Sequence, residues 1–182
     1  QFSMHMWTSI TVGFIFAFPF ILWEIWKFIS PALYEKEKKY AASFIIVSSI
    51  LFFIGVLFGY YLIAPLSVQF FASYIVSPEI SNSIDIDSYM SLMKTSAIAS
   101  GLLFELPIII FFLTKIGLVT PEFLRKYRKY TLVIVLIVAA VITPPDVLSQ
   151  IIVTIPIMIL YEASILISVL VVKSQEREKL KA

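Results

Sequence analysis

Long apolar stretches alternate with short polar segments along the 182 residues of the chain. Five apolar stretches lie at about residues 6–29, 41–64, 95–116, 131–143 and 151–172. A helix needs roughly 20 apolar residues to cross a hydrocarbon core of about 30 Å, and four of the stretches reach that length. The fourth stretch has 13 residues before Pro144, and as a helix it would span only about 20 Å. The pattern therefore predicts an all-α, polytopic transmembrane bundle of five helices, of which the fourth is short.

The same pattern indicates one structural unit. No internal repeat or low-complexity segment separates a second domain, so we expect residues 1–182 to form a single integral-membrane domain with a tail at residues 173–182. The second apolar stretch continues beyond Pro65, which makes it too long for a single crossing. The chain begins at Gln1 without the basic segment of a signal peptide, and we expect it to be a fragment or a trimmed chain.

Basic residues gather in three segments between and after the apolar stretches. These segments hold 13 of the 14 lysines and arginines: Lys27, Lys36, Lys38, Lys39, Lys115, Arg125, Lys126, Arg128, Lys129, Lys173, Arg177, Lys179 and Lys181. With five crossings, all three segments lie on one side of the membrane, whereas residues 77–88 carry three acids and no base on the other. The positive-inside rule therefore puts the basic side and the C-terminus in the cytoplasm. Lys94 is the one basic residue outside this arrangement.

Composition and charge exclude several classes of protein. The chain is 60% hydrophobic and 14% charged, whereas soluble domains are about 45–50% apolar and about 25% charged. A water-soluble enzyme is therefore excluded, and a net charge of +2 gives little attraction for nucleic acid. There is no cysteine and one histidine, His5, so thiolate and multi-histidine metal sites are excluded. No catalytic set and no glycine-rich phosphate loop is present, and we expect neither enzymatic activity nor a cofactor or metal.

Two acids lie inside predicted membrane helices, where a charged side chain is costly. Glu105 lies about ten residues into the third helix and is followed by Pro107, which removes a backbone donor and loosens the helix nearby. Glu162 lies about twelve residues into the last helix. Each acid is either a hydrogen-bonding group between helices or a functional group. A functional role is favoured for Glu105, and an interhelical hydrogen bond is favoured for Glu162.

Other polar residues flank the helices. Thr143 and Gln150 lie at the outer end of the short fourth helix, where they serve either helix packing or the binding of a partner. Glu37 lies in the run SPALYEKEKKY among lysines. Taken by itself, such a run is a solvated group of charges that contributes little to stability.

Several of these segments resemble the TatC family, whose members are the core subunit of the twin-arginine protein translocase. The similar segments are FISPALYEKEKK, FELP, GLVTPEFLRKYRKY, TPPDVLSQ and IPIMILYE, in the family's order and spacing. The resemblance covers almost the whole chain. It implies a concave, glove-like fold of six transmembrane helices with both termini in the cytoplasm, of which this chain lacks the first helix.

The resemblance also implies roles for individual residues. Glu37 corresponds to the acid that receives the arginine pair of a signal peptide, which suits a carboxylate because it accepts two guanidinium hydrogen bonds. Phe28 corresponds to an aromatic residue implicated beside that acid, and Glu105 to the buried acid of the concave face. Thr143 and Gln150 correspond to positions where the single-span subunits TatA and TatB dock.

Asp146 matches the acid of the family's outer turn, and its role stays open, with turn capping as the simpler explanation. Glu162 is likewise a candidate without an assigned role.

From the resemblance we expect a receptor and scaffold in the bacterial cytoplasmic (inner) membrane. It would bind twin-arginine signal peptides of folded cargo and recruit TatA-type and TatB-type subunits. It would also assemble with copies of itself among membrane lipids, and the proton-motive force would drive export. The alternative is a secondary transporter of small solutes or ions that uses Glu105 and Glu162 as proton or cation sites.

Overall fold

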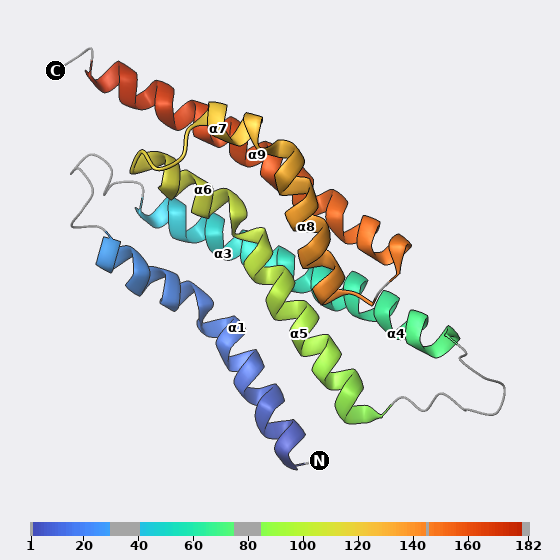
Figure 1. Cartoon of the computed structure of the whole chain (residues 1–182). Coiled ribbons are helices and arrows are strands. Elements are labelled where there is room, and N and C mark those ends of the chain that lie inside the picture. The colour runs from blue at the N-terminus through green and yellow to red at the C-terminus, as the bar shows by residue number, and fades with distance from the viewer. Residues whose placement is uncertain (1, 30–40, 75–84, 145, 180–182) are drawn as a thin grey trace.

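The computed structural model describes residues 2–29, 41–74, 85–144 and 146–179, and every regular element within these ranges is a helix (Figure 1). The elements are α1 (Phe2–Ile29), α3 (Ala41–Phe58), a π-helical turn (Gly59–Ile63), α4 (Ala64–Ser73), α5 (Ile86–Phe104), α6 (Leu106–Lys115), α7 (Pro121–Lys126), α8 (Arg128–Ile142) and α9 (Val147–Lys179). The predicted all-α class is confirmed.

Four helical segments of the described residues are long and apolar enough to cross a membrane. They are Phe2–Phe28, Ser43–Ser73, Ile86–Lys115 and Val147–Arg177. Helix α8 has 15 residues, which span about 22 Å and fall short of a hydrocarbon core of about 30 Å. The predicted arrangement of four long helices and one short helix is confirmed.

The helix bounds differ most from the predicted ones in the third and the last membrane segments. The third membrane segment begins at Ile86 and not near residue 95, and it is interrupted at Glu105. The last helix runs from Val147 to Lys179, so most of the predicted tail is helical. The tail continues the helix because Lys, Arg, Glu and Gln are good helix formers when their side chains are exposed.

The second membrane segment stays helical through Pro65 by widening its turn. The N–H of Ala64 donates to the carbonyl of Gly59, five residues earlier, which makes residues 59–63 a π-helical turn. Pro65 follows at the first turn of α4, a position where a missing N–H is tolerated. The predicted continuation beyond Pro65 is therefore one helical segment of two α-helices joined by a π-turn.

Apolar side chains join the helices in separate clusters. One cluster holds α1, α3 and α5 together, and in it the rings of Phe18 and Phe52 stack with their centroids 3.5 Å apart. Val135 of α8 and Val153 of α9 belong to a second cluster, and Tyr161 of α9 belongs to a third. Many large apolar side chains face outward, Val141 with 82% of its surface exposed. Such faces suit contact with lipid hydrocarbon.

Helices α3 and α5 approach each other most closely where glycines lie. A Cβ atom added at Gly55 would lie 2.7 Å from the carbonyl oxygen of Ser100, and one at Gly59 would lie 2.3 Å from that of Ser96. Small residues allow the backbones of membrane helices to approach closely in this way. The α3–α5 contact is therefore the part of the fold that is least able to accept larger side chains.

The described basic residues other than Lys94 gather at one end of the bundle. Lys27 lies in the last turn of α1, Lys115 in the last turn of α6, and Arg125 and Lys126 in α7. The C-terminal ends of α1, α6 and α9 lie toward the same end as α7, and the N-terminus of α1 lies at the opposite end (Figure 1). We call these the basic end and the opposite end. The structure thus groups the charges as the sequence predicts.

Candidate functional site

The basic end presents an exposed aromatic residue next to charged groups. Phe28, in the last turn of α1, has 87% of its surface exposed. Lys27 directly precedes it; its Nζ donates to Glu24 Oε1 at 2.7 Å, and the same ammonium lies 5.7 Å from the centroid of the Trp23 ring. An aromatic ring and a cation in this setting form a surface suited to a partner. Glu37, the acid predicted to act beside Phe28, lies outside the described residues.

Glu105 lies at the break between α5 and α6. Its own N–H donates to the carbonyl of Leu102 at 3.2 Å, and its carbonyl accepts from the N–H groups of Ile108 and Ile109 at 3.0 Å. Pro107 has no N–H to continue the ladder of α5, so the chain starts a new helix at this point. The sequence signal of an acid followed by Pro107 therefore corresponds to a real interruption of the helix.

The side chain of Glu105 is buried between α5 and α3. It is 6% exposed, and its Oε2 accepts a hydrogen bond from the hydroxyl of Ser48. Its Oε1 is buried without a hydrogen-bond partner among the described residues, as are the hydroxyls of Ser96 and Ser100 on α5. A buried polar group without a partner is unfavourable. The break therefore holds a carboxyl group with capacity for one more hydrogen-bond partner.

Replacing Ser48 by alanine should destabilise the protein by about 1–3 kcal/mol, because it removes the donor of a buried carboxyl group. Ser43→Ala on the same helix is the matched control, since Ser43 is exposed. The control should change the free energy of unfolding by less than about 0.5 kcal/mol. Denaturant unfolding of the two variants in detergent measures the difference. Equal effects would show that the Ser48 hydrogen bond contributes nothing.

The turn between α8 and α9 contains three of the predicted site residues. Thr143 is buried, and its hydroxyl donates to the carbonyl of Ala139 in its own helix at 2.9 Å. Gln150 Nε2 donates to the carbonyl of Leu136 in α8 at 2.8 Å. The Gln150 contact is one of helix packing, one of the two roles left open by the sequence, whereas the Thr143 hydroxyl bonds within its own helix. The half-buried amide of Gln150 ties α9 to the short helix α8.

Asp146 caps the start of α9. Its Oδ2 accepts from the N–H of Ser149 at 2.9 Å and from the hydroxyl of Ser149 at 3.0 Å. These hydrogen bonds, the backbone one above all, lower the pKa of Asp146 from its ordinary value. The cap therefore stabilises the fold above the ordinary pKa, and this stabilisation is lost as the pH falls through the lowered value. The simpler explanation, turn capping, is the one observed.

Glu162 is half-exposed and forms a hydrogen bond between helices, the role that the sequence favoured for it. Arg128 Nη2 donates to Glu162 Oε2 at 2.5 Å, and the two side chains are 49% and 45% exposed. The pair forms because α8 begins at Arg128 and packs along α9, so the guanidinium lies beside the middle of the longer helix. Glu162 joins two helices through an ion pair, and it does not share a site with the buried Glu105.

Sequence reasoning missed the polar contacts that join distant segments. Ser48 was not singled out, although a serine within an apolar helix is a signal of such a contact. The hydroxyl of Tyr161 donates to the carbonyl of Leu124 at 2.8 Å and ties α9 to α7. Gln175 Nε2 donates to the carbonyl of Lys115 at 2.9 Å, so the C-terminal part of α9 holds the end of α6. Each partner is 37 to 60 residues away along the chain.

These residues do not converge on one chemical centre. Among the described residues, no group of three or more histidine, cysteine, aspartate or glutamate side chains could hold a metal ion. The polar features are distributed instead as an exposed aromatic surface at the basic end, a buried acid in the bundle, and a capped turn beside a short helix. This distribution suits the binding of other chains better than a reaction at one point.

Comparison with known proteins agrees on one family. A sequence model described as "Sec-independent protein translocase protein (TatC)" matches residues 1–156. The Sec-independent protein translocase protein TatC of Blattabacterium sp. subsp. Periplaneta americana (strain BPLAN) is 45% identical over 175 residues, which are 96% of this chain and 66% of that protein. TatCy of Bacillus subtilis (strain 168) is 44% identical over 165 residues, which are 91% and 65% of the two chains.

A solved structure has the same fold. The crystal structure of "Twin Arginine Translocase Receptor- TatC in DDM" superposes with a TM-score of 0.77 at 37% identity, covering 92% of this chain and 75% of that one. The chain thus spans about two thirds of the length of the two curated relatives described above.

Proposed function

Because the chain belongs to the TatC family of Sec-independent protein translocase proteins, we propose that it is a receptor and scaffold of the twin-arginine translocase and not an enzyme. It is an integral membrane protein, with four helices able to span a membrane. The proposed substrates are twin-arginine signal peptides of folded proteins. The name of the solved relative, twin-arginine translocase receptor, supports this assignment. The comparisons give no support to the alternative of a small-solute or ion transporter.

The single observation that carries the proposal is the exposure of Phe28 at the basic end. A benzyl side chain with 87% of its surface exposed stands at the last turn of α1, nine residues before Glu37. An aromatic face binds guanidinium groups through cation–π contact, and a carboxylate binds them through paired hydrogen bonds. Glu37 and Phe28 together would therefore recognise the two arginines. Photocrosslinking of a twin-arginine signal peptide to the complete protein tests this proposal.

The basic end would face the cytoplasm. Thirteen of the 14 basic residues lie in three segments of the sequence. The described parts of these segments lie at this end, and cytoplasmic loops carry the excess of lysine and arginine. The C-terminus would then be cytoplasmic in the bacterial inner membrane, and signal peptides would meet the protein before they cross. The lysines beside Glu37 would repel cations that do not place a guanidinium on the carboxylate.

The short helix α8 would be the place where partner subunits act. A helix of about 22 Å thins the bilayer around it, at a cost of a fraction of a kcal/mol per Å of mismatch. TatA-type and TatB-type single-span subunits would dock near Thr143 and Gln150, and copies of the receptor would assemble in the same complex. Glu105, buried at the break between α5 and α6, would be the functional acid of the concave face. Proton-motive force would drive transport.

Gln150→Leu should reduce crosslinking of a TatA-type subunit to the end of α8. The amide oxygen of Gln150 has no hydrogen-bond partner among the described residues, so it is available to a docked subunit, and leucine removes it. Binding of the signal peptide should stay unchanged, because Gln150 is at the end of the molecule opposite Phe28. The matched control is Gln69→Leu in α4, at an exposed position. In vivo photocrosslinking measures both. If the variant loses both peptide binding and partner crosslinking, Gln150 only packs α9 against α8.

A further inference from the structure

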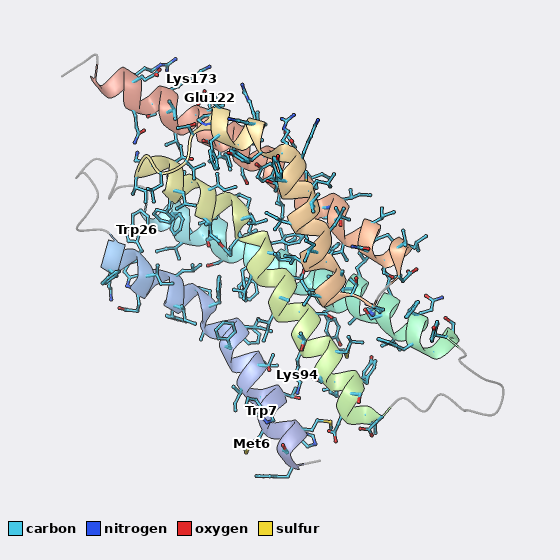
Figure 2. The ribbon with its side chains drawn as sticks, in the orientation of Figure 1. Met6, Trp7, Trp26, Lys94, Glu122 and Lys173 are labelled. Carbon is cyan, nitrogen blue, oxygen red and sulfur yellow. The ribbon has the colours of Figure 1, made fainter. Side chains whose placement is uncertain are left out.

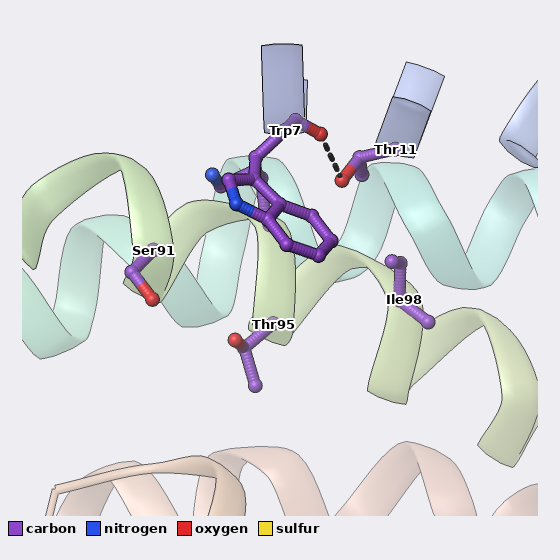
Figure 3. A pocket seen from close by; sticks show the side chains of 6 residues that line it. Trp7, Thr11, Ser91, Thr95 and Ile98 are labelled. Carbon is purple, nitrogen blue, oxygen red and sulfur yellow. Dashed lines mark hydrogen bonds between the residues drawn. The ribbon is translucent and has the colours of Figure 1, made fainter. Parts of the chain in front are cut away.

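A pocket with both polar and apolar lining residues lies between α1 and α5, at the end of the molecule opposite the basic end. It has a volume of about 370 Å³, and its lining residues are Trp7, Thr11, Ser91, Lys94, Thr95 and Ile98. Figure 3 shows the Trp7 side chain extending from α1 toward α5. In Figure 2, Trp7 and Lys94 lie at the end of the molecule far from Lys173 and Glu122. None of these pocket residues belongs to the proposed peptide site.

The pocket contains the one basic residue that does not follow the charge arrangement of the chain. Lys94 is half-buried, and no ion pair or hydrogen bond joins its ammonium group to another described residue. The nearest acid of its own helix in the same register is Asp87, two turns earlier and outside ion-pair distance. A lysine in a membrane helix without an acidic partner is unfavourable. An anion in the pocket would remove this cost.

Further groups of the pocket are available to an anion. The hydroxyls of Ser91 and Thr95, one turn apart on α5, form no hydrogen bond with another part of the chain that the structure describes. Thr11 is different, because its hydroxyl donates to the carbonyl of Trp7 at 2.9 Å. One ammonium and two hydroxyls on the same face of α5 can donate together to several oxygens of one anion. A phosphate group has that number of acceptors.

The pocket lies near the boundary between the hydrocarbon core and the headgroup region of a bilayer. Helices α5 and α6 together cover Ile86–Lys115, a length of about 45 Å. If the segment is centred on a hydrocarbon core of about 30 Å, about 7 Å of helix extends beyond the core at each end. Lys94 is eight residues after Ile86, about 12 Å along the helix. Its ammonium therefore lies within a side chain's reach of the interface, where lysine and tryptophan side chains prefer to lie.

We propose that this pocket binds the phosphate group of an anionic phospholipid from the leaflet opposite the basic end. The Lys94 ammonium pairs with a phosphate oxygen, and the hydroxyls of Ser91 and Thr95 donate to the others. The indole of Trp7 and the side chain of Ile98 contact the glycerol and the first part of the acyl chains. The bound lipid fills the space between α1 and α5 and neutralises a cation that has no ion-pair partner among the described residues. This binding is independent of the proposed peptide site.

The first test is binding of phosphatidylglycerol to the purified protein in detergent, followed by native mass spectrometry. Lys94→Gln should weaken binding about tenfold, the effect of losing one charged hydrogen bond. Lys94→Arg should retain it, because the cation is kept. Lys173→Gln at the basic end is the matched control, since Lys173 is exposed, and it should bind as the unchanged protein does. Equal affinities of Lys94→Gln and Lys173→Gln would overturn the proposal.

The competing anions give the other outcomes. If inorganic phosphate displaces phosphatidylglycerol at equal concentration, the pocket is a site for free phosphate. If oleate binds as tightly as phosphatidylglycerol, the pocket is a site for carboxylates. Either result would overturn the assignment to a phospholipid. Weak competition by both, and weaker binding of zwitterionic phosphatidylcholine, supports it.

A local readout keeps the test independent of stability. Brominated phosphatidylglycerol in vesicles should quench the Trp7 fluorescence, which is obtained as the difference between the unchanged protein and the Trp7→Phe variant. This quenching should fall in Lys94→Gln while thermal unfolding in detergent stays unchanged. Quenching that is the same with and without the Lys94 ammonium would overturn the proposal.

Discussion

Glu37→Lys should abolish binding of a twin-arginine signal peptide to the complete protein. The substitution removes the carboxylate that would accept the guanidinium hydrogen bonds and puts a like charge in its place. Losing one partner of a hydrogen-bonded charge pair costs about 2–5 kcal/mol, or at least roughly 30-fold in affinity. Titration of a labelled signal peptide against the protein in membrane vesicles measures the loss.

Glu35→Lys is the matched control for this prediction. Glu35 lies two residues before Glu37, so its reversal changes the net charge of the segment by the same amount. If a specific carboxylate binds the arginines, Glu35→Lys retains most of the affinity. Equal losses in the two variants would show that the segment attracts the peptide only through its overall charge, and recognition by Glu37 would then be wrong.

Gly55→Ala should strongly destabilise the bundle although it adds a single methyl group. The new Cβ would lie 2.7 Å from the carbonyl oxygen of Ser100 and 2.8 Å from both the Cα of Gly101 and the Cβ of Phe104. Two of these three atoms belong to the backbone of α5, so the helices must move apart. Overpacking of this kind costs about 1–3 kcal/mol and occasionally more, and separation would also weaken the Ser48–Glu105 hydrogen bond. Thermal unfolding in detergent measures the loss.

The matched control is Gly13→Ala, in the middle of another long helix. A Cβ at Gly13 would meet nothing within 4 Å. Alanine is favoured over glycine in a helix by roughly 0.5–1 kcal/mol, so this variant should be as stable as the unchanged protein or slightly more stable. A similar loss of stability in both variants would contradict the close α3–α5 contact. A loss in Gly55→Ala alone would support it.

Hydropathy and charge predicted the parts of the fold that depend on them directly. The bilayer sets how many apolar residues a crossing helix needs, so the four long helices and the short α8 were predictable from length. The grouping of basic residues at one end followed from the number of membrane crossings between the basic segments. Pro107 after Glu105 also indicated a weakened helix where the break between α5 and α6 lies, because proline has no N–H to donate to the helical hydrogen bonds.

Contacts between distant segments were not predictable in this way. Ser48 and Ser49 are adjacent serines in the same apolar stretch, and only the packing of α3 on α5 decides that Ser48 meets Glu105. An interhelical hydrogen bond was favoured for Glu162, but its partner Arg128, which lies 34 residues earlier at the start of α8, was not identified. Helix packing is set by the fit of side chains along both surfaces, which hydropathy alone does not contain.

The candidate site was predictable only in part, because some of its features depend on how distant helices pack together. Phe28 and Glu37 were identified from a resemblance, and the structure adds that Phe28 is exposed at the basic end. The capping role of Asp146 follows from the geometry of one turn, which local sequence signals describe well. Lys94 was recognised as an exception to the charge arrangement, but its pocket depends on the meeting of α1 and α5.

The most direct test of the receptor function compares the two ends of α1. A photocrosslinking amino acid is placed at Phe28 or at Phe2, which are 87% and 81% exposed at opposite ends of this helix. In the complete protein in membranes, a twin-arginine signal peptide should crosslink from position 28 and not from position 2. The same peptide with both arginines replaced by lysine should crosslink from neither. Equal crosslinking from the two positions, or from the two peptides at position 28, would contradict a receptor for twin-arginine signals at the basic end.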